Sequence, residues 1–187
     1  MLDTILSIGM VIIFGIVFNV LIPALIISFA SALLRKTSGG AHATTSFRCA
    51  AIGAFVAVGF AVLIEAFSKL FSLYNTAAYF ISAFVVSYLI IIKLAPVDSP
   101  NKRIVKESKI QELKKKSVRT LSIYGIICSL LIIAGGFYGS GLFLKYSVLV
   151  STGFLWQSFT LTSIGHVVSN ALELPFGYIK LTGGEKE

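Results

Sequence analysis

Two residues near the start of the sequence, His42 and Cys49, are of the types that carry out thiol chemistry. A cysteine attacks a carbonyl carbon as its thiolate, and an unperturbed thiol with a pKa of ~8.5 is only a few per cent ionised near neutral pH. His42 could act as the base, and Arg48 adds positive potential beside Cys49. Both residues lie in a short polar segment, 35–49, so the pattern is compatible with a nucleophilic dyad.

The spacing of the two residues sets a condition on such a dyad. Residues seven apart on one continuous helix are separated by about 10.5 Å along its axis. A dyad therefore requires a break before the helix of Cys49, and Gly39 and Gly40 allow the chain to fold back. We expect Cys49 in the first turn of that helix, where unpaired N–H groups and the helix dipole favour an anion. The alternative is a polar re-entrant loop with an interfacial histidine and a small buried cysteine.

The composition indicates what surrounds this segment. Of the 187 residues, 56% are apolar and 13% charged, and the mean hydropathy is +0.91, which excludes an ordinary soluble domain. We expect an all-α, polytopic membrane protein formed by one transmembrane domain over residues 1–187. The apolar runs predict five spans, or six long apolar helices if the first run divides near Asn19 and Pro23, at about 4–34, 47–70, 74–92, 121–137 and 142–172.

The basic residues predict an orientation. The segments 35–48 and 93–119 hold most of the chain's Lys and Arg, so the positive-inside rule assigns both to the cytoplasm, as a catalytic loop and a basic loop. Residues 102–119 carry eight Lys or Arg against Glu107 and Glu112. This charge could hold an acidic substrate, or it could fix the topology and attract anionic lipid. The pattern within 102–117 also fits a helix on the membrane surface.

The run Gly39-Gly40-Ala41-His42, followed by Cys49, closely resembles the accessory gene regulator B (AgrB) family of membrane cysteine endopeptidases. Two other segments support the resemblance. Residues 95–103 are similar to the family's Ala-Pro-x-Asp segment before a basic loop, and residues 153–158 resemble its last span, which carries a glutamine.

The resemblance implies a function. Proteins of this family cut an AgrD-type propeptide and hold the released acyl group as a thioester for macrocyclisation into a quorum-sensing peptide. Cys49 would be the nucleophile, and His42 the base that later protonates the leaving amine. The resemblance further implies a multi-pass protein of the bacterial cell membrane that needs no cofactor or metal. Its expected partners are an AgrD-like propeptide, anionic lipid and a second copy of the chain, and not nucleic acid.

Other polar residues have two readings each. Asp98 could orient His42 or form a turn before Pro100. Gln157 could donate to a developing oxyanion or form an interhelical hydrogen bond. Arg35 could contact substrate carboxylates or anchor a helix end. The candidates for holding an acidic substrate are Arg35, Lys114, Lys115 and Lys116, and Gly39 and Gly40 are candidate supporting residues of the site.

Several residues compete with this interpretation or lie outside it. His166 could serve as an alternative base, whereas Cys128 fits a buried filler. Glu65 and Lys69, spaced i,i+4, are expected to form a local ion pair. The rival function is a small non-enzymatic transporter or adaptor in which the glycine-broken segment lines a substrate path. Such a protein should tolerate Cys49→Ser, whereas an enzyme should lose all processing in Cys49→Ala or His42→Ala while still inserting into the membrane.

Overall fold

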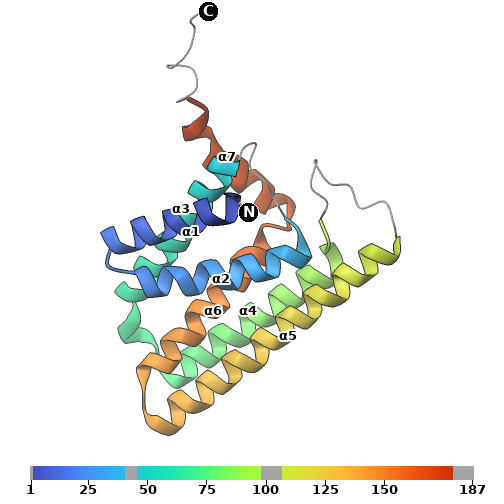
Figure 1. The fold of residues 1–187 in the computed structure, drawn as a ribbon. Coiled ribbons are helices and arrows are strands. Elements are labelled where there is room, and N and C mark those ends of the chain that lie inside the picture. The colour runs from blue at the N-terminus through green and yellow to red at the C-terminus, as the bar shows by residue number, and fades with distance from the viewer. Residues whose placement is uncertain (1, 41–45, 98–106, 179–187) are drawn as a thin grey trace, which may run out of the picture.

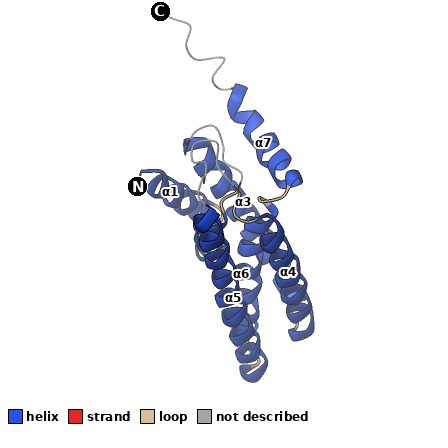
Figure 2. Ribbon diagram, turned by 90° about the vertical axis from the view of Figure 1, so that its right-hand side faces the viewer, coloured by secondary structure: helices blue, strands red, loops and turns tan. Residues whose placement is uncertain are grey.

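The chain is helical throughout the residues that the computed structural model describes, 2–40, 46–97 and 107–178. Figures 1 and 2 show the helices gathered in a bundle, with α7 projecting from one end. The elements are α1 (Leu2–Val17), α2 (Leu21–Ser38), α3 (Ser46–Ala66), the short 3₁₀ helix η1 (Ser68–Leu70), α4 (Leu73–Leu94), α5 (Glu107–Tyr138), α6 (Gly141–Phe159) and α7 (Ser163–Tyr178).

Four helices in the described part of the chain, α2, α3, α4 and α5, are long and apolar enough to cross a membrane. The prediction of an all-helical protein with several spans is thus confirmed, but the predicted number of five to six spans is not. The first and last apolar runs, 4–34 and 142–172, are each divided into two helices. Each of these helices is shorter than the run it comes from, and some are more polar than a membrane span usually is.

The first apolar run breaks at Asn19, near the expected place. Asn19 has φ 55°, in the left-handed region that asparagine tolerates better than most residues. The N–H of Val20 donates to the carbonyl of Gly15 at 2.8 Å. A Cβ at Gly15 would lie 2.9 Å from the Cα of Leu21, so the turn requires a glycine there. As a result α1 folds back against α2 and α3.

The last apolar run breaks at residues 160–162, where hydroxyl groups take over the backbone hydrogen bonding. Thr162 Oγ1 accepts from the N–H of Gly165 at 3.0 Å, in the manner of a helix N-cap. The preceding helix, α6, contacts α2, α4 and α5 and forms the centre of the bundle. Most of its buried side chains are small or polar, and Gly153 lets α2 approach so closely that a Cβ would lie 2.7 Å from the carbonyl of Ile27.

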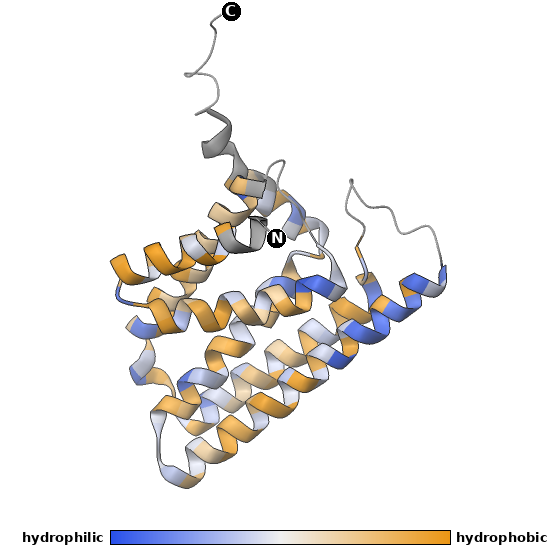
Figure 3. Ribbon diagram, in the orientation of Figure 1, coloured by the Kyte–Doolittle hydropathy of each residue, from blue (hydrophilic) through white to orange (hydrophobic). Residues whose placement is uncertain are grey.

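The basic segment differs from the expected surface helix. Residues 107–119 form the beginning of α5, which continues without interruption through the predicted fourth span to Tyr138. At 1.5 Å per residue this helix is about 48 Å long, against a hydrocarbon core of about 30 Å. Its first turns therefore extend beyond the apolar layer, where Figure 3 shows hydrophilic residues. Residues 102–106 lie outside the described residues.

Two expectations about isolated polar groups have different outcomes. Cys128 is fully buried, as predicted, with its thiol 3.6 Å from the hydroxyl of Ser151. The predicted ion pair of Glu65 with Lys69 is wrong, because Glu65 instead pairs with Lys145 of α6, at 2.9 Å. A lysine on a neighbouring helix reaches the carboxylate from the side, which helix periodicity alone does not reveal.

Candidate active site

Cys49 lies in the first turn of α3, as the sequence analysis expects. It is the fourth residue of the helix, it is half-buried, and it forms no disulfide. The first four N–H groups of a helix have no carbonyl partner within the helix, and the dipole is positive at this end. The position therefore favours a developing negative charge on sulfur or on an attacked carbonyl oxygen.

The helix before Cys49, α2, ends at the paired glycines. α2 ends at Ser38, and Gly39 and Gly40 adopt φ angles of 72° and 131°, which are not helical. α3 begins at Ser46, beyond His42 in the sequence. His42 itself and Asp98 lie outside the described residues.

The end of α2 is held by residues from α6 and from the segment after α4, an arrangement that we name the glycine clamp (Ser38, Gly39, Val97 and Gln157). The N–H of Val97 donates to the carbonyl of Ser38 at 2.9 Å. Gln157 Nε2 donates to the carbonyl of Gly39 at 2.7 Å and to Ser38 Oγ at 3.3 Å. The clamp fixes the point from which the segment carrying His42 leaves α2.

Gly39 of the clamp and the neighbouring Gly40 are both required by close contacts as well as by their φ angles. A Cβ at Gly39 would collide with the carbonyl oxygen of Val97. A Cβ at Gly40 would lie 2.9 Å from Thr160 Oγ1 and 3.1 Å from Gln157 Nε2. A side chain at either position would push the end of α2 away from its partners.

Gln157 is only 1% exposed, so its hydrogen bonds are not shared with solvent. Its Nε2 is engaged with the end of α2, which fits the interhelical role rather than donation to an oxyanion. Its Oε1 has no hydrogen-bond partner among the described residues. In this state Gln157 positions the chain that leads to the active-site segment.

The basic residues of α5 lie at the same end of the molecule as the clamp. α4 and α5 run antiparallel, because Leu73 meets Gly136 and Phe84 meets Gly125. If this pairing is continued along both helices, residues 114–116 of α5 lie beside the end of α4. The chain that leads to Val97 starts from that end. Lys115 is exposed, and Lys116 pairs with Glu112 at 2.6 Å on the exposed surface.

Arg35 and His166 also belong to this region. Arg35 is half-buried in the last turn of α2, directly before the clamp. His166 is half-buried in the first turn of α7, a helix that contacts α3, the helix of Cys49. His166 therefore stays the alternative base. The sequence analysis did not single out Ser38 or Val97 as residues of the site. The only indication of a role for them is that Ser38 precedes Gly39 and Val97 precedes Asp98 in the sequence.

Comparisons with known proteins point to one family. The sequence pattern described as Accessory gene regulator B matches residues 1–161. AgrB-like protein 2 of Clostridium perfringens (strain 13 / Type A) is 39% identical over 178 residues, which cover 92% of this chain and 81% of the relative. An AgrB-like protein of C. perfringens (strain SM101 / Type A) is 38% identical over the same shares. No solved structure matches.

Proposed function

This chain belongs to the accessory gene regulator B family, and from that premise we propose that it is a membrane cysteine endopeptidase acting on an AgrD-like propeptide. Membership of the family implies a part in the processing of agr quorum-sensing peptides. The proposal adds the reaction and its residues, with Cys49 as nucleophile and His42 as base.

The observation that carries the proposal is the break between α2 and α3. The glycine clamp ends one helix at Ser38, and Cys49 opens another that begins at Ser46. A break between the two helices supports the proposal, because a dyad seven residues apart needs one. It also leaves Cys49 at a helix N-terminus, where an anion is favoured.

The reaction follows from thiol chemistry. His42 takes the proton of the Cys49 thiol as sulfur bonds to the scissile carbonyl carbon, and the carbonyl oxygen becomes an oxyanion. When this intermediate collapses, the C–N bond breaks and His42 protonates the amine of the leaving carboxyl-terminal fragment. The thioester keeps the acyl group activated. A thiol or hydroxyl within the peptide then attacks it, which closes the macrocycle and releases Cys49.

Exclusion of water decides between cyclisation and hydrolysis of the thioester. Gly40, buried next to the clamp, and Ala50, buried next to Cys49 in the sequence, favour such exclusion. The basic turn of α5, with Lys114, Lys115 and Lys116, would hold an acidic part of the propeptide near Cys49. A homodimer, expected from the family, stays a prediction.

The test is intact mass spectrometry of the protein in liposomes with its propeptide. The wild-type protein should show an acyl adduct and release a carboxyl-terminal fragment. Cys49→Ala should abolish both, and His42→Ala should lower them by about 10²-fold or more, the usual range for a general base. Cys128→Ala is the matched control, because this second cysteine is buried in α5.

Two outcomes would contradict the proposal. Loss of processing in His166→Ala but not in His42→Ala would assign the base to α7. A cognate peptide that is neither cut nor attached by a folded wild-type protein would remove the endopeptidase assignment and favour the transporter or adaptor.

A further inference from the structure

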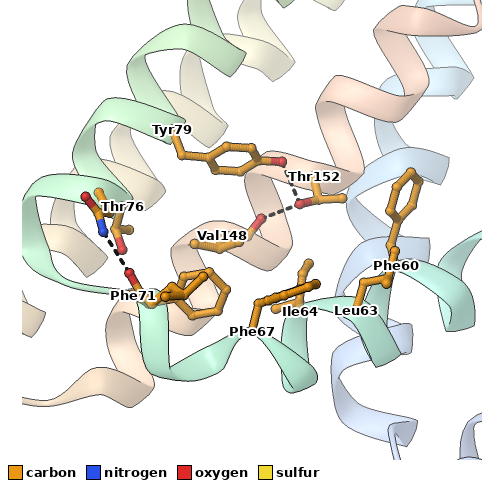
Figure 4. Close-up of a pocket in the computed structure, with 11 residues that line it drawn as sticks. Phe60, Leu63, Ile64, Phe67, Phe71, Thr76, Tyr79, Val148 and Thr152 are labelled. Atoms are coloured by element: carbon orange, nitrogen blue, oxygen red, sulfur yellow. Dashed lines mark hydrogen bonds between the residues drawn. The ribbon is translucent and has the colours of Figure 1, made fainter.

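A hollow between α3 and α4 is not used by the peptidase chemistry, and we name it the α3–α4 pocket. Its volume is about 420 Å³, within the range of about 300–1,000 Å³ typical of sites for small organic ligands. The second half of α3, η1 and the first half of α4 form its walls, and α6 forms its floor. In Figure 4, Tyr79 lies on one side of the pocket, Phe67 and Phe71 lie on the other, and Val148 lies between them.

The pocket exists because α3 and α4 pack against different neighbours. α3 packs mainly against α1 and α2, whereas α4 packs against α5 and α6. The connection through η1 joins the two helices at one end, and from there they diverge. Leu63, Phe67 and Leu70 of the lining are each more than half exposed, so the pocket is open at the surface of the bundle.

The lining selects hydrocarbon. Tyr79 Oη lies 2.9 Å from Thr152 Oγ1, and Thr152 Oγ1 donates to the carbonyl of Val148 at 2.8 Å. The Tyr79 hydroxyl is therefore the donor of the first bond. Asn75 Nδ2 donates to the carbonyl of Leu70 at 3.0 Å. Thr76 Oγ1 is buried without a hydrogen-bond partner among the described residues. The described residues that line the pocket include none with a charge, and most of the others are aromatic or aliphatic, so the lining favours hydrocarbon over water.

A membrane protein presents such a pocket to lipid. α3 and α4 are both candidate membrane spans, and large apolar side chains are exposed along them. An unfilled apolar hollow forfeits the dispersion contacts that a hydrocarbon chain would make with its walls. We propose that the α3–α4 pocket binds an acyl chain of a membrane phospholipid.

The polar end of this lipid has a partner next to the pocket. Lys69 is exposed and follows Ser68 in η1, directly before the lining residue Leu70. Glu65 does not neutralise it, because Lys145 contacts both carboxylate oxygens of Glu65, at 2.9 and 3.3 Å. The ammonium group of Lys69, next in the sequence to a lining residue, is thus available to a lipid phosphate. The site thus favours an anionic phospholipid.

Photocrosslinking in nanodiscs tests this site. The protein is reconstituted with phosphatidylglycerol or phosphatidylcholine that carries a diazirine on an acyl chain, irradiated, and mapped by peptide mass spectrometry. Labelling of the pocket segments should exceed that of the exposed face of α5, around Ile126 and Ile133, severalfold. Phosphatidylglycerol should be preferred about fivefold. Lys69→Gln should remove this preference, and Lys93→Gln, exposed at the end of α4, should keep it.

A filled pocket provides the second arm. Val148→Phe extends the floor into the hollow and should reduce pocket labelling to the level of α5. Ile133→Phe, the same enlargement on an exposed face, should leave it unchanged. If Val148→Phe does not elute as the wild-type protein does, Leu63→Phe fills the pocket from its rim.

Three results would overturn the assignment. The first is labelling of the wild-type pocket at the level of α5. The second is labelling that persists in folded Val148→Phe or Leu63→Phe. Displacement of the label by the propeptide would assign the pocket to the peptide instead of a lipid. Equal labelling by the two lipids would remove the role of Lys69. None of these readouts depends on catalysis by Cys49.

Discussion

Gly39 is constrained both by its backbone conformation and by its surroundings. Its φ of 72° is unfavourable for residues with a Cβ, and its surroundings leave no room for one beside Val97. We expect Gly39→Ala to lower the free energy of unfolding by about 1–3 kcal/mol and to slow formation of the acyl adduct. Thermal denaturation in detergent and single-turnover kinetics measure the two effects.

Gly53→Ala is the matched control for this prediction. Gly53 lies within α3, and a Cβ there would meet no atom within 4 Å. Alanine should therefore stabilise the helix by up to about 1 kcal/mol. If the two variants behaved alike, the glycine clamp would not have the positioning role assigned to it.

The sequence predicted the helix ends around the candidate site better than the contacts that hold them. Gly39 and Gly40 stand out as a break, and the helix start at Cys49 follows from the apolar run after it. Val97 has no such signal, because its bond to Ser38 joins segments that are far apart in the sequence. Gln157 was assigned two roles, and only the packed structure shows which group its amide reaches.

At the scale of helices, the continuity of α5 suggests how an acidic peptide is held. Its basic turns form a rigid extension of a membrane span, at the end where the clamp lies. We expect the triple change of Lys114, Lys115 and Lys116 to Gln to raise the KM for the propeptide about tenfold, since exposed charge contacts contribute modestly. The kcat should change little. Steady-state kinetics at two salt concentrations measures both.

Lys69→Gln serves as the control for this prediction, since it removes an exposed charge from η1, at the other end of α4 from Lys114, Lys115 and Lys116. High salt should raise the wild-type KM toward that of the triple variant, because exposed ion pairs are screened. A salt-independent KM in the wild-type protein would contradict the electrostatic explanation.

Apolar runs predicted where helices occur but not where they break. The helices α3 and α4 begin within a residue or so of the predicted spans at 47 and 74. The break near residue 161 was missed because the run 142–172 is apolar on average, although Thr160, Thr162 and Ser163 have hydroxyl groups that can end or cap a helix. Hydropathy reports which residues avoid water. Local hydrogen bonds, which it does not register, end the helices.

At the scale of the whole molecule, one ion pair joins α3 to α6. Glu65 and Lys145 are 35% and 23% exposed, so each charge is partly removed from water. We expect Glu65→Gln and Lys145→Gln each to lower the unfolding free energy. The sum of the two losses should exceed the loss in the double variant by a coupling energy of about 1 kcal/mol. Thermal denaturation of the four proteins completes the cycle.

A second cycle gives the comparison. Glu112 and Lys116 form a closer pair, but both are more than half exposed, and their coupling should not exceed about 0.5 kcal/mol. Equal couplings in the two cycles would mean that the α3–α6 pair is as well solvated as the surface pair.

The buried polarity of α6 has a consequence for how the protein is made. Ser147, Ser151, Gln157 and Ser158 lie inside the bundle, and α6 is absent from the helices apolar enough to span a membrane unaided. Polar side chains oppose the partitioning of a single nascent helix from the translocon into lipid. α6 therefore depends on α2, α4 and α5, all made before it, to receive those side chains. We therefore expect the helix at the centre of the finished protein to take its place only after the three helices around it have been synthesised.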